Sequence, residues 1–174
     1  MPRSGFRVTA LVLAMGAAAS SPAEVTLDGS LGPAGSLPGP DFAITADLGE
    51  QVGGNLFHSF STLNVNAGEI LTFTSAFAGV TDNVISRVTG STSTLIDGPV
   101  FNTIPGSSLW MINPNGLVFG EGAFVDVQGG FHATTADYLL LDDGGRFGAD
   151  LSLPGNTTLT MGNPASFGFI CDSP

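Results

Sequence analysis

Residues 109–128 read LWMINPNGLVFGEGAFVDVQ, three short apolar segments separated by turn residues. The segments, 109–112, 117–119 and 123–127, have the length and the β-branched and aromatic content of strands. In the last one Ala123, Val125 and Val127 occupy alternate positions, so they share one face of the strand. The stretch therefore predicts three strands joined by sharp corners.

Similar segments recur along the chain and are bounded by its 25 Gly and 11 Pro. They lie at residues 24–27, 42–46, 63–66, 70–74, 84–89 and 157–161. Helical periodicity is nearly absent, and the best helix candidate, residues 134–141, is short enough to be a strand instead. The residues before Phe42 are poor in strands and indicate a loop or part of an end cap.

Many short strands with tight corners fit either a β-sandwich or barrel, or a β-solenoid. A sandwich favours Asn-Gly or Asp-Gly turns between matched strands. The pairs at residues 28–29, 97–98 and 115–116 do not lie between strands of equal length. The solenoid is therefore slightly favoured, and coils of roughly 20–25 residues would give about six or seven of them.

The first 23 residues differ from the rest and indicate a secretory signal peptide. Arg3 and Arg7 precede or border a short apolar run, and small residues follow up to Ala23. The run is shorter than the roughly 20 apolar residues that a membrane span needs. We expect export through the Sec translocon and cleavage before Glu24, with a cut after Ala19 as the alternative. One domain, residues 24–174, remains.

The predicted mature chain is strongly acidic. It has two arginines, Arg87 and Arg146, and no lysine against all 15 acidic residues, a net charge of −13. Such a surface repels nucleic acid and anionic lipid, which are bound through Lys and Arg. A hydrophobic content of 43% with 13 Phe argues against disorder. The lone Cys171 cannot form an internal disulfide, so stability must come from packing and backbone pairing.

The titratable residues form no catalytic or metal-binding pattern. His58 and His132 have no cluster of Asp, Glu, His or Cys at ligand spacing, which favours packing or corner roles. The acidic stretch at residues 142–145 lacks the calcium-solenoid repeat and the EF-hand spacing, so an exposed turn is expected. A hydrolase elbow and a phosphate loop are absent from the sequence. We therefore expect no enzymatic activity, no cofactor and no metal.

Arg87 lies in a strand-like segment and is expected to be at least partly buried. A buried arginine needs an acidic partner, and Asp82, Asp97 and Glu121 are the candidates. A structural ion pair is the first interpretation, and contact with a partner protein is the second.

An ordered set of segments within residues 24–170 carries a family resemblance. The set comprises Asn55-Leu56-Phe57-His58-Ser59-Phe60-Ser61, Val84-Ile85-Ser86-Arg87-Val88-Thr89-Gly90, Leu109-Trp110-Met111-Ile112-Asn113-Pro114-Asn115-Gly116 and Phe131-His132-Ala133-Thr134. In order and spacing it resembles the N-terminal domain of filamentous haemagglutinin, the secretion domain of two-partner secretion exoproteins. The resemblance implies an all-β fold, a right-handed parallel β-helix (single-stranded solenoid) with an N-terminal β cap.

The resemblance also implies a function. In the periplasm such a domain is recognised by a partner outer-membrane β-barrel transporter, and outside the cell it nucleates folding of an adhesin-, haemagglutinin- or haemolysin-like passenger. The expected product is a secreted or cell-surface monomer without nucleic-acid or small-molecule ligands.

The site residues implied by the resemblance fall into two groups. The turn Asn113, Pro114, Asn115 and Gly116 is interpreted equally as a core-anchored corner and as part of the secretion signal. The other signature residues are expected to be structural or to contact the transporter: Asn55, Phe57, His58, Ser59, Phe60, Ser86, Arg87, Val88, Thr89, Gly90, Phe131 and His132.

Two features depart from the family pattern. Better-known members carry an additional Asn-Pro-Asn-Leu motif before the Val-Thr-Gly segment, whereas residues 78–83 here read AGVTDN. This resembles the branch of the family marked by Ser-Arg-Val-Thr-Gly. The chain also stops at Pro174 within an apparent coil, so we expect a domain shortened at its C-terminal end.

Two other functions remain open from the residues. An autonomous surface adhesin or carbohydrate-binding module would need an exposed aromatic platform, for which one Trp and one Tyr are a thin supply. A β-helical polysaccharide lyase or hydrolase needs several acids and also Arg or Lys for the substrate's carboxylates, and two arginines are too few.

Overall fold

The computed structural model describes residues 25–76 and 80–170. Every regular element in these ranges is a β-strand except one short 3-10 turn, η1 (Ala46–Leu48). None of the helical structure in these ranges is long and apolar enough to cross a membrane. The predicted signal peptide, Cys171 and part of the 78–83 segment lie outside the described residues.

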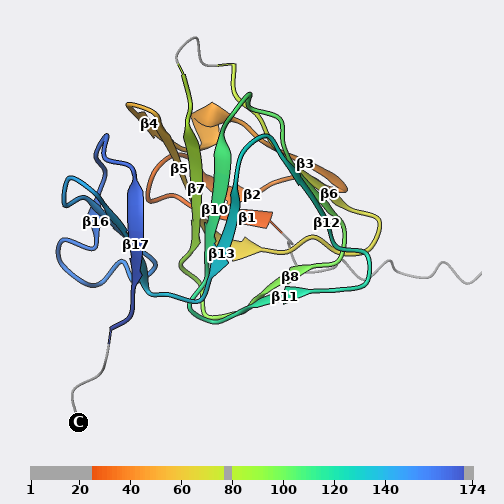
Figure 1. The fold of residues 1–174 in the computed structure, drawn as a ribbon. Coiled ribbons are helices and arrows are strands. Elements are labelled where there is room, and N and C mark those ends of the chain that lie inside the picture. The colour runs from red at the N-terminus through yellow and green to blue at the C-terminus, as the bar shows by residue number, and fades with distance from the viewer. Residues whose placement is uncertain (1–24, 77–79, 171–174) are drawn as a thin grey trace, which may run out of the picture.

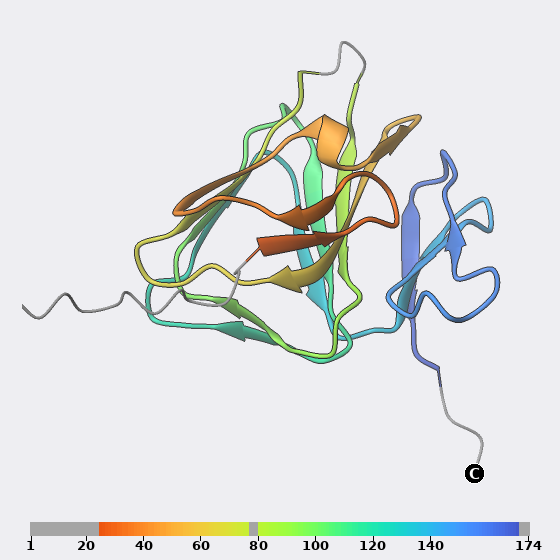
Figure 2. The same ribbon diagram turned by 180° about the vertical axis from the view of Figure 1, so that it is seen from behind.

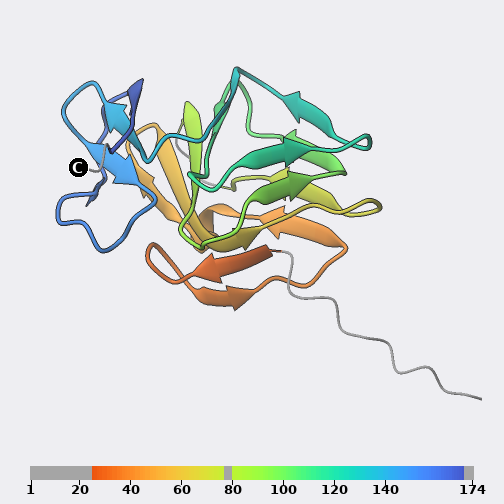
Figure 3. The ribbon, with the colours of Figure 1, turned by 90° about the horizontal axis from the view of Figure 1, so that it is seen from below.

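Three parallel sheets form the sides of a β-solenoid of about four turns (Figure 1). Sheet A contains β5 (Asn55–Leu63), β7 (Asn83–Val88), β10 (Ser108–Ile112) and β13 (Phe131–Thr134). Sheet B contains β3 (Asp41–Ile44), β6 (Ile70–Phe73), β9 (Pro99–Asn102) and β12 (Phe124–Val127). Sheet C contains β8 (Thr94–Ile96) and β11 (Leu117–Phe119). Figure 3 shows the coils stacked on one another.

Stacked apolar side chains fill the interior of the solenoid. Leu56, Val84 and Leu109 occupy equivalent positions on β5, β7 and β10 and are fully buried. Paired residues give coil lengths of 28 (Asn55 with Asn83), 25 (Asn83 with Ser108) and 22 residues (Leu109 with Phe131). The alternation predicted for residues 123–127 is confirmed, because Ala123, Val125 and Val127 pack against this core.

Antiparallel strands close the first end of the solenoid. β1 (Val25–Asp28) pairs with β5 and with β2 (Ala34–Ser36), and β4 (Glu50–Val52) also pairs with β5. Figure 2 shows β1 and β2, in red-orange, lying across the coils. A solenoid needs such a cap, because its first coil otherwise exposes an unpaired strand edge. The prediction of an all-β parallel β-helix with an N-terminal β cap is therefore confirmed.

A fourth sheet, sheet D, covers the outer face of sheet A. It is antiparallel and consists of β14 (Tyr138–Leu141), β15 (Arg146–Gly148), β16 (Thr157–Thr158) and β17 (Pro164–Gly168). The interface is a second apolar cluster of buried residues: Phe57, Ile85 and Ile112 from sheet A, with Leu139, Leu141 and Phe147 from sheet D. β5 and β7 of sheet A are therefore buried on both faces.

Sheet D also explains where the sequence-based coil count is wrong. After β13 the chain leaves the solenoid and builds sheet D, so about four turns form in place of six or seven. Thr134 is the last residue of β13, and residues 138–141 form β14. The segment 134–141 therefore contributes to strands and forms no helix.

Candidate functional site

The structure brings two signature segments together at one end of sheet A. Residues 86–88 end β7 and residues 89–90 follow it, and residues 113–116 follow β10. Since β7 and β10 are neighbouring parallel strands, their C-terminal ends lie side by side. The candidate site is this strand end together with the parts of the N-terminal cap and sheet D that contact it.

Arg87 points outward from sheet A and is nevertheless fully buried. Its Nε donates a hydrogen bond to Ser59 Oγ at 2.7 Å, and its Nη2 donates to Ser30 Oγ at 3.0 Å. Its Nη1 donates to the Gly148 carbonyl oxygen at 2.7 Å and to Thr157 Oγ1 at 2.6 Å. The guanidinium therefore contacts the cap, the solenoid and sheet D at once.

Asp28, at the end of β1, is the acid whose charge acts on Arg87. Asp28 Oδ2 accepts hydrogen bonds from Ser59 Oγ at 2.6 Å and from Thr89 Oγ1 at 2.7 Å, so the Ser59 hydroxyl bridges the two charges. Burial lowers the pKa of Arg87 to about 10, and the charge of Asp28 acts against this. Burial alone would raise the pKa of Asp28, but hydrogen bonds from Ser59, Ser30 and Thr89 outweigh it and hold that pKa below its ordinary value.

The acidic partner predicted for Arg87 is therefore wrong. Asp82 and Glu121 are exposed, and Asp97 Oδ1 accepts a hydrogen bond from the Gly122 amide at another corner. The observed acid comes from the cap, because β1 pairs with β5 and its last residue lies beside Ser59. The charges interact through a hydroxyl and not through a direct ion pair.

Thr89 and Gly90 fix the chain where it leaves β7. The Thr89 amide and hydroxyl both donate to the Phe60 carbonyl oxygen, at 2.8 and 3.1 Å. A Cβ at Gly90 would lie 2.0 Å from the Ser61 carbonyl oxygen, far inside contact distance. Val88 lies in the solenoid core. The local structure therefore needs glycine at position 90.

The turn after β10 is bonded to the segment after β7. Asn113 is fully buried, and its Nδ2 donates to the Thr92 carbonyl oxygen at 3.1 Å and to Thr94 Oγ1 at 2.9 Å. Asn115 is exposed, and its Nδ2 donates to the Gly90 carbonyl oxygen at 2.8 Å. Gly116 has φ +114°, which L side chains rarely adopt. The predicted corner is thus observed, and it holds two coils together.

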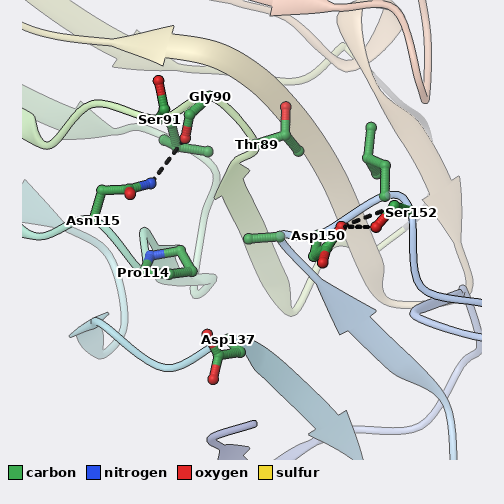
Figure 4. Close-up of a pocket in the computed structure, with 11 residues that line it drawn as sticks. Thr89, Gly90, Ser91, Pro114, Asn115, Asp137, Asp150 and Ser152 are labelled. Atoms are coloured by element: carbon green, nitrogen blue, oxygen red, sulfur yellow. Dashed lines mark hydrogen bonds between the residues drawn. The ribbon is translucent and has the colours of Figure 1, made fainter. Parts of the chain in front are cut away.

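An open cavity of about 440 Å³ lies where these segments face sheet D (Figure 4). Its wall is formed by Val88, Thr89, Gly90, Ser91, Pro114, Asn115, Asp137, Ala149, Asp150, Leu151 and Ser152. Figure 4 shows Asp137 and Asp150 across the cavity from Pro114 and Asn115. Hydrogen bonds from the hydroxyl and amide of Ser152 lower the pKa of Asp150 below its ordinary value. The two signature segments therefore share one accessible, acidic surface.

Because Asn113 is buried and Asn115 is exposed, replacing each by alanine should lower the unfolding free energy by different amounts. Asn113→Ala removes the hydrogen bonds to the partly buried Thr92 carbonyl oxygen and to the buried Thr94 hydroxyl, and also the Oδ1 acceptor of the Asn115 amide. The unfolding free energy should therefore fall by about 2–3 kcal/mol. Asn115→Ala removes one exposed hydrogen bond, and the fall should be below about 1 kcal/mol. Urea unfolding followed by the fluorescence of Trp110 measures both. Equal losses for the two variants would contradict this division.

Alternate signature residues of β5 pack into the solenoid core and into the interface with sheet D. Phe60 faces the solenoid interior, whereas Phe57 faces sheet D and packs on Phe147 with ring centroids 5.0 Å apart. Asn55 Nδ2 donates to the carbonyl oxygens of Thr160 and Gly162, so it also fastens sheet D. These contacts support structural roles for this segment.

His58 is buried in the interior between Phe60 and Phe73, with ring centroids 6.2 and 5.8 Å away. Neither ring nitrogen has a hydrogen-bond partner of ordinary geometry. Burial lowers the pKa of His58 to about 4, and the Leu48 backbone and the Asp47 carboxylate offset only part of this effect. Ser86, the neighbour of His58 on β7, is buried with an unpaired Oγ.

The last signature segment lies on β13. His132 stacks on Trp110, with ring centroids 3.6 Å apart and an angle of 8° between the planes. Trp110 also donates from Nε1 to Asn83 Oδ1 at 3.1 Å and packs against Phe167 of sheet D. Phe131 is half-buried against the solenoid core. Both histidines therefore have packing roles in the structure.

The acidic stretch at residues 142–145 forms a turn, as predicted. Asp143 accepts hydrogen bonds from Thr160 Oγ1 and from the Gly145 and Gly162 amides, and these lower its pKa. Asp142 accepts from the amide of Asn163. Across residues 25–76 and 80–170 no three His, Cys, Asp or Glu side chains form a group that could hold a metal ion.

Sequence reasoning missed the partners that Arg87 finds far along the chain. Ser30 lies in the cap, and Gly148 and Thr157 lie in sheet D. Ser and Thr are common in this chain, and Gly148 contributes only its carbonyl oxygen, so no local pattern marks these positions. The one available signal was Asp28, an acid that directly follows the predicted strand 24–27.

Comparison with known proteins gives one match. A family model described as the TPS secretion domain matches residues 23–170, which includes every signature segment. No curated protein and no solved structure matches the chain. Because the family model covers most of the chain and the fold is the expected β-solenoid, the chain belongs to the TPS secretion domain family and is the N-terminal domain of a two-partner secretion exoprotein.

Proposed function

We propose that this domain directs secretion of an exoprotein through a specific outer-membrane β-barrel transporter and then nucleates the passenger's folding. The proposal includes export to the periplasm by the signal peptide, followed by release to the cell surface or the medium. Family membership supports the two-partner route. The arrangement of the last coil supports the nucleating role and is the structural observation that carries it.

The last coil leaves a parallel edge open. β11, β12 and β13 each have a single strand neighbour within their sheets, so the opposite edge of each strand is unpaired by any described strand. Val118, Phe119 and Phe124, at this end, are about half exposed. In sheet A the first solenoid strand, β5, is paired with the cap and the last, β13, has an open edge, which gives this sheet a direction of growth. An added strand gains both backbone hydrogen bonds and apolar contacts.

Recognition by the transporter is proposed to use the extended chain before the solenoid closes. The alternating segments of sheet A carry apolar side chains on both faces, such as Leu56 and Phe57 on β5. An extended segment of this kind can add as a strand to an exposed sheet edge of a periplasmic domain. Folding outside the cell would then bury both faces and release the partner.

We also propose that the domain is neither an enzyme nor a sugar-binding module. Arg87 is buried, and Arg146 lies over the Tyr138 ring at 3.5 Å from its centroid, so neither arginine is placed to bind a polyanionic sugar. The same contact covers one face of Tyr138, and His132 covers one face of Trp110. These contacts leave little of an aromatic platform at either residue.

Secretion assays test the proposal directly. The chain with its signal peptide should reach the medium when the transporter of its own exoprotein is co-expressed, and should stay in the periplasm without it. Asn115→Ala should fold normally when refolded in vitro, and its secretion should fall if residues 113–116 belong to the signal. Ser91→Ala, in the same cavity wall, is the matched control. Immunoblots of medium and periplasm give the measurement.

Each outcome has a distinct meaning. Secretion independent of the transporter would overturn the proposal and favour an autonomous surface module. Transporter-dependent secretion that is equal for Asn115→Ala and Ser91→Ala would retain the proposal and assign the turn to folding alone.

A further inference from the structure

Arg87 is the one described side chain that bonds to the cap, the solenoid and sheet D together. Its four hydrogen bonds reach Ser30, Ser59, Gly148 and Thr157, which lie 57, 28, 61 and 70 residues away in sequence. Two of the four acceptors, the Gly148 carbonyl oxygen and Thr157 Oγ1, belong to sheet D. The ring of Phe147, also from sheet D, lies 4.3 Å from the guanidinium carbon.

The guanidinium keeps its charge inside the protein. Its pKa, lowered by burial to about 10, remains well above neutral pH. A buried charge is tolerated only when its donors are paired, and removing part of the pairing has a large effect. Without sheet D, the guanidinium would lose the bonds to Gly148 and Thr157 and would face water.

Sheet D is attached to the solenoid by the apolar cluster around Phe57 and Phe147, the Asn55 bonds to the 160–162 loop, and the packing of Phe167 on Trp110. Two residues of the cap, Leu31 and Val52, also pack against this apolar cluster. Among the described hydrogen bonds, the path from sheet D to the cap runs through Arg87 to Ser30 and, through Ser59, to Asp28. The guanidinium therefore makes the hydrogen-bonded connection between sheet D and the cap.

We propose that Arg87 is a latch that makes the order of the N-terminal cap depend on the docking of sheet D. With sheet D docked, the guanidinium is held in place and its bond to Ser30 secures the cap. With sheet D undocked, the guanidinium turns to water, and β1 and β2 open more often. The domain is complete only when its last strands are in place. This inference does not depend on the transporter.

Hydrogen exchange on the chain without its predicted signal peptide tests the latch. Thr157→Val removes the Nη1 acceptor in sheet D, and exchange should become about fivefold faster in the cap, at the Leu37 amide that bonds to the Val25 carbonyl oxygen. Thr158→Val, on the same strand, is the matched control. Its hydroxyl bonds only locally, to Gly155, and exchange in the cap should not change.

Ser30→Ala supplies the second arm, because it removes the direct bond between Arg87 and the cap and leaves sheet D untouched. In this background only the route through Ser59 to Asp28 remains, so Thr157→Val should alter exchange in the cap much less. Faster exchange confined to sheet D in the Thr157→Val protein would overturn the proposal. So would a cap response of equal size in the presence and absence of the Ser30 hydroxyl, because the coupling would then bypass Arg87.

Discussion

Gly90→Ala is expected to lower the unfolding free energy by about 3 kcal/mol, although it adds a single methyl group. The new Cβ would lie 2.0 Å from the Ser61 carbonyl oxygen, a backbone atom that cannot rotate away. This clash is relieved only if the ends of β5 and β7 move apart. That movement strains the hydrogen bonds of Thr89 to the Phe60 carbonyl oxygen, and urea unfolding measures the loss.

The neighbouring residue gives the control for Gly90→Ala. Ser91 is exposed, and Ser91→Ala should leave the unfolding free energy within about 0.5 kcal/mol of the parent. If Gly90→Ala is equally mild, the close approach of the two coils is not what requires glycine. A large loss in Gly90→Ala with a mild effect of Ser91→Ala would assign the Val-Thr-Gly signature to backbone packing.

Much of the fold could be predicted from the sequence, because short-range patterns determine it. The alternation of Ala123, Val125 and Val127 fixed a face of β12, and the Asn-Pro-Asn-Gly stretch fixed a corner. Sheet D was not accessible in the same way. Its strands are short and antiparallel, and they depend on apolar contacts between Phe147 and Phe57, 90 residues apart in sequence. The coil count failed for this reason.

The site was accessible only in part. The signature segments lie within the matched residues 23–170, but the partners of Arg87 could not be predicted, since it is satisfied by hydroxyls and a carbonyl from distant segments. A rule that seeks an acid for a buried arginine looks for a direct ion pair, and here Ser59 stands between Arg87 and Asp28. Hydroxyl-mediated networks leave no spacing pattern in the sequence.

Three of the residues that carry the family resemblance also stabilise the fold. Thr89 bonds to the cap, Gly90 permits close approach of two coils, and Asn115 bonds to Gly90 from the next coil. A change at Thr89 or Gly90 disturbs the strand end that lines the cavity, whereas a change at the exposed Asn115 removes only its bond to Gly90. A role of this strand end in the proposed recognition can therefore be separated from its role in folding only at exposed residues such as Asn115, which is why the secretion assay relies on it.

Acidification from pH 6.5 to pH 4 is expected to remove about 3 kcal/mol of unfolding free energy through His58 alone. The pKa of His58 is about 4 in the folded chain, against an ordinary value of 6.5, because the ring is buried. Between these values the unfolded chain binds the proton and the folded chain does not, so stability is full above pH 6.5 and falls toward pH 4. The lowered pKa values of Asp28 and Asp143 act in a lower window, below their ordinary value of 3.8.

His58→Phe isolates this contribution. Phenylalanine can occupy the space between Phe60 and Phe73 but does not titrate, so the stability of the variant should change much less from pH 6.5 to pH 4. Urea unfolding at half-unit pH steps, followed by Trp110 fluorescence, gives both curves. Because the carboxylates with lowered pKa act below this range, an unchanged slope in His58→Phe would show that the buried imidazole does not carry the pH dependence. A flattened slope would show that a signature residue of this family is a neutral core side chain, kept unprotonated by the two phenylalanines and the coil around it.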